Sequence, residues 1–288
     1  MRFDSVARVA RVARVAHVAS VAGCVLAGLM LGERDAAAYH DETQRLTEDT
    51  AYTLPAHTVR LGLWQVAYAP VDSFSFGTYL WPWVLRIANV HVKERFYQND
   101  PLAFAVSASG YVFNTRSLRI VTDQAGDANV AVLPLELAAS YRLTAFTLSL
   151  GLAWTQVWAD GSFGQDALGG AGRGAASNLQ VTSTVEWRAT QVTALVLHAR
   201  YLIFQRLTGA ATAELHPDPY TTVDVHATAL PNALDYRGAA SVTAAVALSF
   251  ETFNLRAGVG YGNYNVPGVN FVIDRRLVYP DLDFYWIF

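Results

Sequence analysis

Apolar and polar residues alternate along most of the chain beyond its N-terminus. Over residues 252–263 every second residue is apolar, and the residues between them are polar or glycine. Successive side chains of a β-strand point to opposite faces, so this pattern predicts a strand with one apolar and one polar face. A helix would scatter the same residues around its circumference. The same alternation marks residues 128–142, 144–158, 178–189, 192–205 and 236–250.

The pattern predicts about twelve strands, with ten or fourteen as the alternatives. Short connections alternate with longer ones, and bacterial barrels place short turns in the periplasm and long loops outside. With both chain ends on the periplasmic side, this alternation of short and long connections requires one more strand before residue 57. Residues 47–53 are the weakest strand prediction, because Glu48 and Asp49 interrupt the alternation. The expected strands cover residues 47–53, 57–69, 72–79, 89–98, 102–113, 128–142, 144–158, 178–189, 192–205, 236–250, 252–263 and 279–288.

The distribution of bulky and charged side chains indicates which face of these strands meets water. Charged residues and glycines share one parity, opposite a wall of Leu, Phe and Trp. A soluble sandwich would put the bulky apolar side chains inside and the charges outside. A barrel with lipid outside and a polar lumen fits better, so the predicted fold is an all-β, transmembrane, antiparallel up-and-down β-barrel over residues 39–288. A secreted soluble sandwich or barrel is the alternative, because it also alternates.

Composition agrees with a membrane protein that crosses the bilayer with strands. Hydrophobic residues make up 52% and charged residues 16% of the 288 residues, against roughly 25% charged residues in an average soluble domain. Beyond the N-terminus, however, no run reaches the roughly 18 apolar residues that a spanning helix needs. The formal net charge of −3 also argues against a nucleic-acid partner, which would need a basic surface.

Residues 1–38 have the layout of a secretory signal peptide. Arginines precede an uncharged stretch over residues 18–32, and three alanines at 36–38 supply the small residues for cleavage. The alternative is lipidation at Cys24, because residues 21–24 resemble a lipoprotein box. Most of the apolar stretch follows this cysteine, which favours ordinary cleavage. Cys24 is the single cysteine, so cleavage leaves a mature chain without disulfide or thiolate chemistry.

The chain ends on an aromatic strand in which Leu282, Phe284, Trp286 and Phe288 share one parity. This ending resembles the C-terminal signal of Gram-negative outer-membrane β-barrel proteins, which the barrel assembly machinery reads. The resemblance implies a location in the outer membrane, with outer-membrane lipid and the assembly machinery as partners. It points to the superfamily and to no particular family within it.

Aromatic residues near the predicted strand ends predict two interfacial girdles, since their amphipathic rings favour the membrane–water boundary. The connection over residues 80–88, which contains Trp81-Pro82-Trp83, is expected to rest on the rim or fold into the mouth. The outer girdle is expected from Tyr111, Phe113, Trp158, Tyr261 and Tyr264, and the inner girdle from Tyr68, Phe96, Tyr141, Trp187 and Phe250.

The inward parity carries most of the charged residues, and a positive lining raises the local concentration of anions. We therefore expect a narrow channel for small polar or anionic solutes. The alternative is a non-conducting structural or loop-binding barrel, whose closed lumen pairs arginines with carboxylates such as Glu136 and Glu186. The expected lumen-lining residues are Arg60, His91, Lys93, Arg95, Glu136, Arg142, Glu186, Arg188, His198, Arg200 and Arg256.

No motif for catalysis, metal binding or a cofactor stands out. A lipid-modifying barrel enzyme would need a serine beside a histidine, and only a cross-strand pair of His91 with Ser107 or Ser109 stays open. The histidines and carboxylates within 206–235 match no standard metal spacing. The glycine-rich stretch over 159–177 lacks the Lys-Ser/Thr of a phosphate loop. We therefore expect no enzymatic activity, no metal and no cofactor.

Overall fold

Antiparallel strands form a closed barrel in the computed structural model of the chain. The structure describes residues 46–115, 127–165, 168–218, 221–229, 237–250, 252–266, 268 and 270–288. The expected signal peptide over residues 1–38, with Cys24, lies outside the described residues. No helix in the described part of the chain is long and apolar enough to cross a bilayer.

The described part of the chain contains thirteen strands and one short helix. The helix, α2 (Leu80–Val84), lies between the third and fourth strands. The strands are β1 (Thr58–Gly62), β2 (Gln65–Val71), β3 (Phe74–Tyr79), β4 (Ala88–Asn99), β5 (Leu102–Asn114), β6 (Asp127–Arg142), β7 (Phe146–Gln165), β8 (Leu168–Arg188), β9 (Thr193–Asp218), β10 (Thr221–Ala229), β11 (Ala240–Ser249), β12 (Phe253–Val266) and β13 (Phe271–Ile287).

Twelve of these strands close the barrel, as the sequence predicts. Each pairs antiparallel with its neighbours in chain order, except that β9 pairs with β11 because β10 lies outside the ring. The ring closes between β13 and β1, where Arg60 lies opposite Ile287. The C-terminal Phe288 exchanges two backbone hydrogen bonds with Val59, each of 3.0 Å. The aromatic C-terminal strand therefore completes the wall.

The two faces of the wall differ as the alternation predicts. On β7, Leu148, Leu150 and Leu152 are exposed on the outer face, while Ser149 and Thr155 are buried inside. The inner face of β8 is polar along its length, with buried Asn178, Gln180, Thr182, Thr184 and Glu186. An apolar exterior around a polar interior is the arrangement that lipid requires. The fold is that of a transmembrane β-barrel.

Two predicted strand boundaries near the N-terminus are wrong, and the errors cancel in the count. Residues 47–53 form no strand. Residues 57–69, predicted as one strand, form two, because the chain turns at 63–64 between β1 and β2. The alternation changes parity at this turn, from the outward Val59, Leu61 and Leu63 to the outward Val66 and Tyr68, and this change is the sign of the turn in the sequence.

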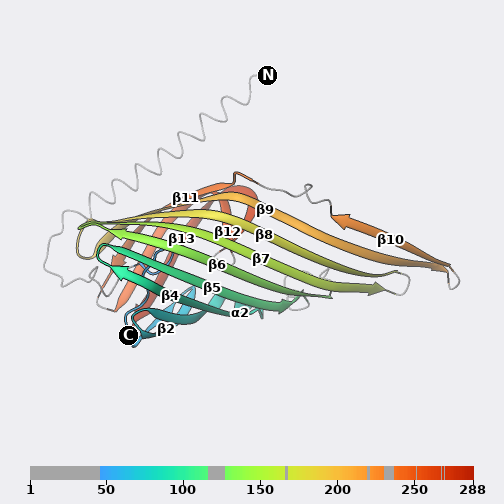
Figure 1. Ribbon diagram of the computed structural model, residues 1–288, viewed down its shortest axis with the longest axis horizontal. Coiled ribbons are helices and arrows are strands. Elements are labelled where there is room, and N and C mark those ends of the chain that lie inside the picture. The colour runs from blue at the N-terminus through green and yellow to red at the C-terminus, as the bar shows by residue number, and fades with distance from the viewer. Residues whose placement is uncertain are drawn as a thin grey trace, which may run out of the picture. The chain divides into compact units, whose positions relative to one another are not determined.

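The strands β7, β8 and β9 run well beyond the predicted ends. The expected loops over 159–177 and 206–235 are largely continuations of the barrel ladder: Asp160 lies opposite Arg173, and Ala175 lies opposite Thr208. The additional strand β10 pairs with the far part of β9 (Figure 1). Small residues with weak strand propensity continue the strands here, because the neighbouring strand supplies a hydrogen-bond partner for each backbone amide and carbonyl.

The aromatic girdles are partly as expected. Trp158 and Tyr261 are exposed toward the outer rim, and Tyr141, Trp187 and Phe250 are exposed near the short turns. Tyr111, however, is 2% exposed and faces the lumen, and Tyr264 also lines the interior. Both had been assigned by their nearness to a strand end, and the parity of their strands places them inside. Glu94 is a charged residue on the outward parity of Val90 and Phe96, and it lies beside a β-bulge, since the register of β4 and β5 shifts between Glu94 and Tyr97.

The placement of lipid on the outer face can be tested with one substitution and a matched control. Leu150→Arg, on the exposed face between Phe146 and Trp158, should lower the free energy of unfolding by about 2–4 kcal/mol, the cost of an arginine near the bilayer midplane. Leu207→Arg, beyond Tyr201 on the extension of β9, should cost less than about 1 kcal/mol. Urea unfolding in phosphatidylcholine vesicles measures both. Equal losses at the two positions would contradict this membrane placement.

Candidate functional site

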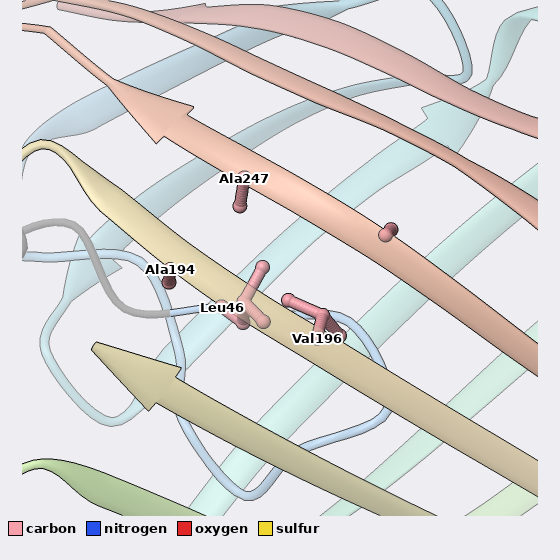
Figure 2. Close-up of a cluster of buried hydrophobic side chains, with 5 residues drawn as sticks. Leu46, Ala194, Val196 and Ala247 are labelled. Atoms are coloured by element: carbon pink, nitrogen blue, oxygen red, sulfur yellow. The ribbon is translucent and has the colours of Figure 1, made fainter. Parts of the chain in front are cut away.

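We call residues 46–57, which precede β1, the N-terminal segment; its residues 46–54 lie inside the barrel. Ala51, Tyr52 and Leu54 are almost completely buried. Figure 2 shows Leu46 against Ala194 and Val196 of β9 and Ala247 of β11. These wall residues belong to the inward parity of their strands. The residues predicted as the first strand thus fill part of the lumen.

Hydrogen bonds from several strands hold the backbone of the N-terminal segment. The amide of Ala51 donates to Oγ of Ser140 on β6, at 2.8 Å. The ammonium of Lys93 on β4 donates to the carbonyls of Thr47 and Thr50. The amide of Ala56 donates to the carboxylate of Asp72, at 2.6 Å. These bonds satisfy polar groups that would otherwise be buried without partners.

Glu48 connects two arginines of the wall. Its Oε1 lies 2.6 Å from Nη2 of Arg60, and its Oε2 lies 3.2 Å from Nη1 of Arg256. Two carboxylates of β13 complete the network: Asp283 lies 2.6 Å from Arg60, and Asp281 lies 3.1 Å from Arg256. Burial opposes the ionised form of Glu48, but Arg60 and Arg256 still hold its pKa below the usual value.

Asp49 pairs with a third arginine. Its Oδ1 lies 2.7 Å from Nη2 of Arg200, and its Oδ2 lies 3.8 Å from Nδ1 of His198. Burial alone would raise the pKa of Asp49, but Arg200, followed by His198, lowers it to about 2. Both acids of the N-terminal segment therefore stay ionised at neutral pH and bind the wall through charge.

The connection between β12 and β13 reaches into the lumen from the opposite side. Nδ2 of Asn178 and Nε2 of Gln180 donate to the carbonyl of Asn270, at 2.8 and 2.6 Å. Nη1 of Arg200 donates to Oδ1 of Asn270, at 2.9 Å. At Gly268, with φ of +76°, a Cβ would lie 2.5 Å from the hydroxyl of Tyr111, so glycine is required for this close approach. We call this part of the chain, with Gly268 and Asn270, the outer connection. Arg200 thus contacts both Asp49 and the outer connection.

A cavity of about 220 Å³ is bounded by the N-terminal segment, by the outer connection and by the wall. Part of its lining is aromatic, from Trp64, Tyr79, Tyr264 and Tyr279. Another part is polar, from His91, Ser109 and Glu136 among others. This mixture suits a small amphipathic molecule better than a hydrated ion alone.

Seven of the expected lumen residues line this cavity: Arg60, His91, Lys93, Glu136, His198, Arg200 and Arg256. Arg95, Arg142, Glu186 and Arg188 do not line it. Among the described residues no ion pair joins Glu136 to Arg142, and Arg188 donates to the carbonyl of Leu143 at 3.3 Å. Sequence reasoning missed Glu48 and Asp49 as lumen residues. Their signal was present, because two adjacent acids interrupt the alternation of a supposed strand.

The wall is low where β1, β2 and β3 meet the helix. These strands have 5, 7 and 6 residues, whereas a tilted strand needs about 9–11 to cross the hydrocarbon. Nε1 of Trp64 donates to the carbonyl of Leu282 at 2.6 Å across this region. In the expected apolar connection, Trp83 and Val84 are exposed at the rim, while Ile87 is buried in the mouth against Tyr111 and Val132.

Two histidines contact hydroxyl groups, but neither arrangement makes a complete catalytic site. Nδ1 of His91 lies 2.9 Å from Oγ of Ser109, the cross-strand pair left open by the sequence. Nε2 of His198 accepts from Nε of Arg200 at 2.8 Å, so its proton is on Nδ1, facing Thr184. A serine nucleophile needs a base oriented by a third group, and within the described residues no carboxylate lies within ion-pair distance of His91.

The expected absence of metal and cofactor stays a prediction. Among the described residues, no cluster of histidine, cysteine or carboxylate side chains has the geometry of a metal site. The five acidic and histidine residues of 206–235 lie on β9 and β10, with Asp224 opposite Glu214 in the register. Their side chains lie outside the description.

Comparison with known proteins gives similar structures but no family. No family model and no curated protein matches the chain. The toluene transporter TodX of Pseudomonas putida is 13% identical, with a TM-score of 0.45 over 89% of this chain and 73% of that chain. The hydrocarbon channel CymD is 11% identical, with a TM-score of 0.45 over 87% and 72%. OmpT, an outer-membrane protein of Vibrio cholerae, is 15% identical, with a TM-score of 0.32 over 77% and 62%. These values assign no substrate to the chain.

The role of the two acids can be tested by thiol labelling of the N-terminal segment. In a Cys24→Ala background, Thr50→Cys places a near-isosteric thiol at a position that is 2% exposed. Adding Glu48→Gln and Asp49→Asn should speed maleimide labelling by about thirtyfold, since two losses of about 1 kcal/mol each sum to about 2 kcal/mol. The side chains of Glu48 and Asp49 are 25% and 23% exposed. Each acid's ion pair is therefore expected to stabilise the closed segment by about 1 kcal/mol, which is less than a fully buried ion pair would contribute.

The matched control is Asp160→Asn, which removes an exposed pair with Arg173 far from the lumen. It should leave the labelling rate unchanged. An unchanged rate in the variant without the two acids would show that charge does not hold the segment.

Proposed function

We propose that the protein is an outer-membrane channel for small solutes, closed in this conformation by its own N-terminal segment. The observation that carries the proposal is the position of residues 46–54 inside the lumen, bound through Glu48 and Asp49 to cationic wall residues. The segment enters at the end of the barrel where the short turns and Phe288 lie. By the usual orientation of bacterial barrels, this end faces the periplasm.

The N-terminal segment can leave the lumen without breaking the hydrogen bonds of the wall. The backbone ladder of the barrel starts at Thr58 and closes against β13 without any residue of the segment. The wall therefore keeps its hydrogen bonds when the segment leaves. The large apolar anchors are few, namely Leu46, Tyr52 and Leu54. Charge pairs that water can replace supply much of the remaining attachment.

The open lumen supports the expected preference for polar or anionic solutes. With the segment inside, Glu48 and Asp49 pair with Arg60, Arg200 and Arg256. When the segment leaves, these arginines face water, and the lining gains positive charge that raises the local anion concentration. The preference for anions is therefore a property of the open state and not of the closed state.

Electrical recording tests this proposal. A variant that lacks residues 46–54 should give a sustained current in planar bilayers, with anions carrying more of it than cations. The full chain should be silent for most of the recording time. Adding Arg200→Glu and Arg256→Glu to the deletion variant should reverse the selectivity, because the two changes replace positive charge by negative charge in the lining.

Correct folding of the deletion variant is verified by its heat-modifiable migration in gels. A folded but silent deletion variant would contradict the channel and favour the non-conducting barrel.

A further inference from the structure

The charges around the cavity do not balance. With both histidines counted neutral, the cationic side chains are four: Arg60, Lys93, Arg200 and Arg256. The carboxylates that line the cavity or pair with these residues are five: Glu48, Asp49, Glu136, Asp281 and Asp283. With every carboxylate counted as ionised, the closed lumen therefore carries one negative charge in excess. A buried charge without a partner is costly, so the site favours an occupant of opposite sign.

The excess charge can be traced to Glu136. Glu48, Asp49, Asp281 and Asp283 each lie within 3.2 Å of an arginine. Within the part of the chain that the structure describes, Glu136 makes no ion pair, and its buried Oε1 has no hydrogen-bond partner. The ammonium of Lys93, two strands away, is committed to carbonyls of the N-terminal segment.

The residues next to Glu136 in the wall are small, and on one side Glu136 borders the cavity together with Ser107. The cross-strand neighbours of Glu136 are Ser107 on β5 and Ala153 on β7, both small. Gly151, two residues before Ala153 on β7, is also small. A Cβ at this position would lie 3.0 Å from Oε1 of Glu136 and 2.3 Å from Oγ1 of Thr182. The Thr182 hydroxyl is also buried without a partner. Glycine at position 151 thus lets these two oxygens approach the backbone of β7, and the space for a ligand is the cavity that Glu136 lines.

Aromatic rings supply the other part of the cavity. Trp64, Tyr79, Tyr264 and Tyr279 line it together with Glu136. The ring of Tyr279 lies over Gly260, where any Cβ would overlap it. Aromatic faces attract cations and also pack against apolar groups. A carboxylate with aromatic walls is suited to an organic ammonium compound.

We propose that the closed lumen binds a small organic ammonium compound with an aromatic or compact apolar body, with Glu136 as its counter-ion, and that this ligand holds the channel closed. The proposal rests on the proposed function. An ammonium group neutralises the excess charge of the closed state. When the N-terminal segment leaves with Glu48 and Asp49, three carboxylates face the same four cations, and the lining becomes positive. The ligand then binds the open state less well, and differential binding shifts the population toward the closed state.

Binding and closure are measured together in the purified full chain. The probe is benzylamine, with benzyl alcohol and benzoate as neutral and anionic compounds of the same size. Titration calorimetry measures binding, and maleimide labelling of Thr50→Cys in the Cys24→Ala background measures exposure of the segment. Benzylamine should bind best, and at ten times its Kd it should slow labelling about tenfold, as expected for a ligand of the closed state alone. Benzyl alcohol and benzoate should not slow labelling.

Glu136→Gln should abolish the advantage of benzylamine over benzyl alcohol. Glu136→Asp, which keeps the charge, should retain it in part and serves if the glutamine variant does not fold. The matched control is Glu186→Gln, a buried inward carboxylate that does not line the cavity, and it should bind benzylamine like the wild-type chain.

Equal binding of benzylamine and benzyl alcohol, or an advantage that survives Glu136→Gln, would overturn the ammonium proposal. Sustained current in the deletion variant would then still support the channel. A silent deletion variant together with Glu136-dependent amine binding would leave the site in place and remove the gating role.

Discussion

Pairing of buried charge inside the barrel is the constraint on which the structure of the lumen depends. The inward face of the wall presents Arg60, Arg200 and Arg256, which cannot lie in a narrow polar interior without counter-charges. β13 supplies two carboxylates and the N-terminal segment supplies two more. The segment is therefore the counter-ion of the wall, and the cavity is the space that remains between this segment, the outer connection and the strands.

The same constraint is the reason why we expect the closed state to be reversible. The backbone ladder of the wall closes between β1 and β13 without the segment, so removing the segment breaks charge pairs and a few apolar contacts and leaves the sheet intact. Water can solvate Glu48 and Asp49 once they leave, and it can enter to solvate the arginines. A segment held mainly by apolar burial would instead expose a large apolar surface on leaving.

The sequence predicts the wall well because lipid outside and polar groups inside impose a period of two. This constraint acts on every spanning strand, and it placed the faces of β6, β7, β8, β11 and β12. It also predicted that the terminal aromatic strand completes the barrel. Tyr111 was misplaced where nearness to a strand end was preferred to parity. The extension of β7–β9 was missed because strands outside the membrane pair without needing the alternation.

The lumen is less predictable than the wall. The sequence identified the cations that line it, since their parity is visible, but their partners depend on a segment that folds back from outside the sheet. Glu48 and Asp49 showed only as a flaw in a weak strand. That Glu136 lacks a partner could not be predicted, because Arg142 and Lys93 are both near it in the sequence or the sheet and neither pairs with it.

Hydrogen exchange of the N-terminal segment in outer-membrane vesicles tests the central claim most directly. Mass spectrometry of the peptide covering residues 46–57 would report whether its amides, such as that of Ala51 bonded to Ser140, are protected. If the segment fills the lumen, these amides exchange orders of magnitude more slowly than in the free peptide. Exchange at the rate of an unstructured chain would show that the lumen is not closed by this segment, and the account of the site would be wrong.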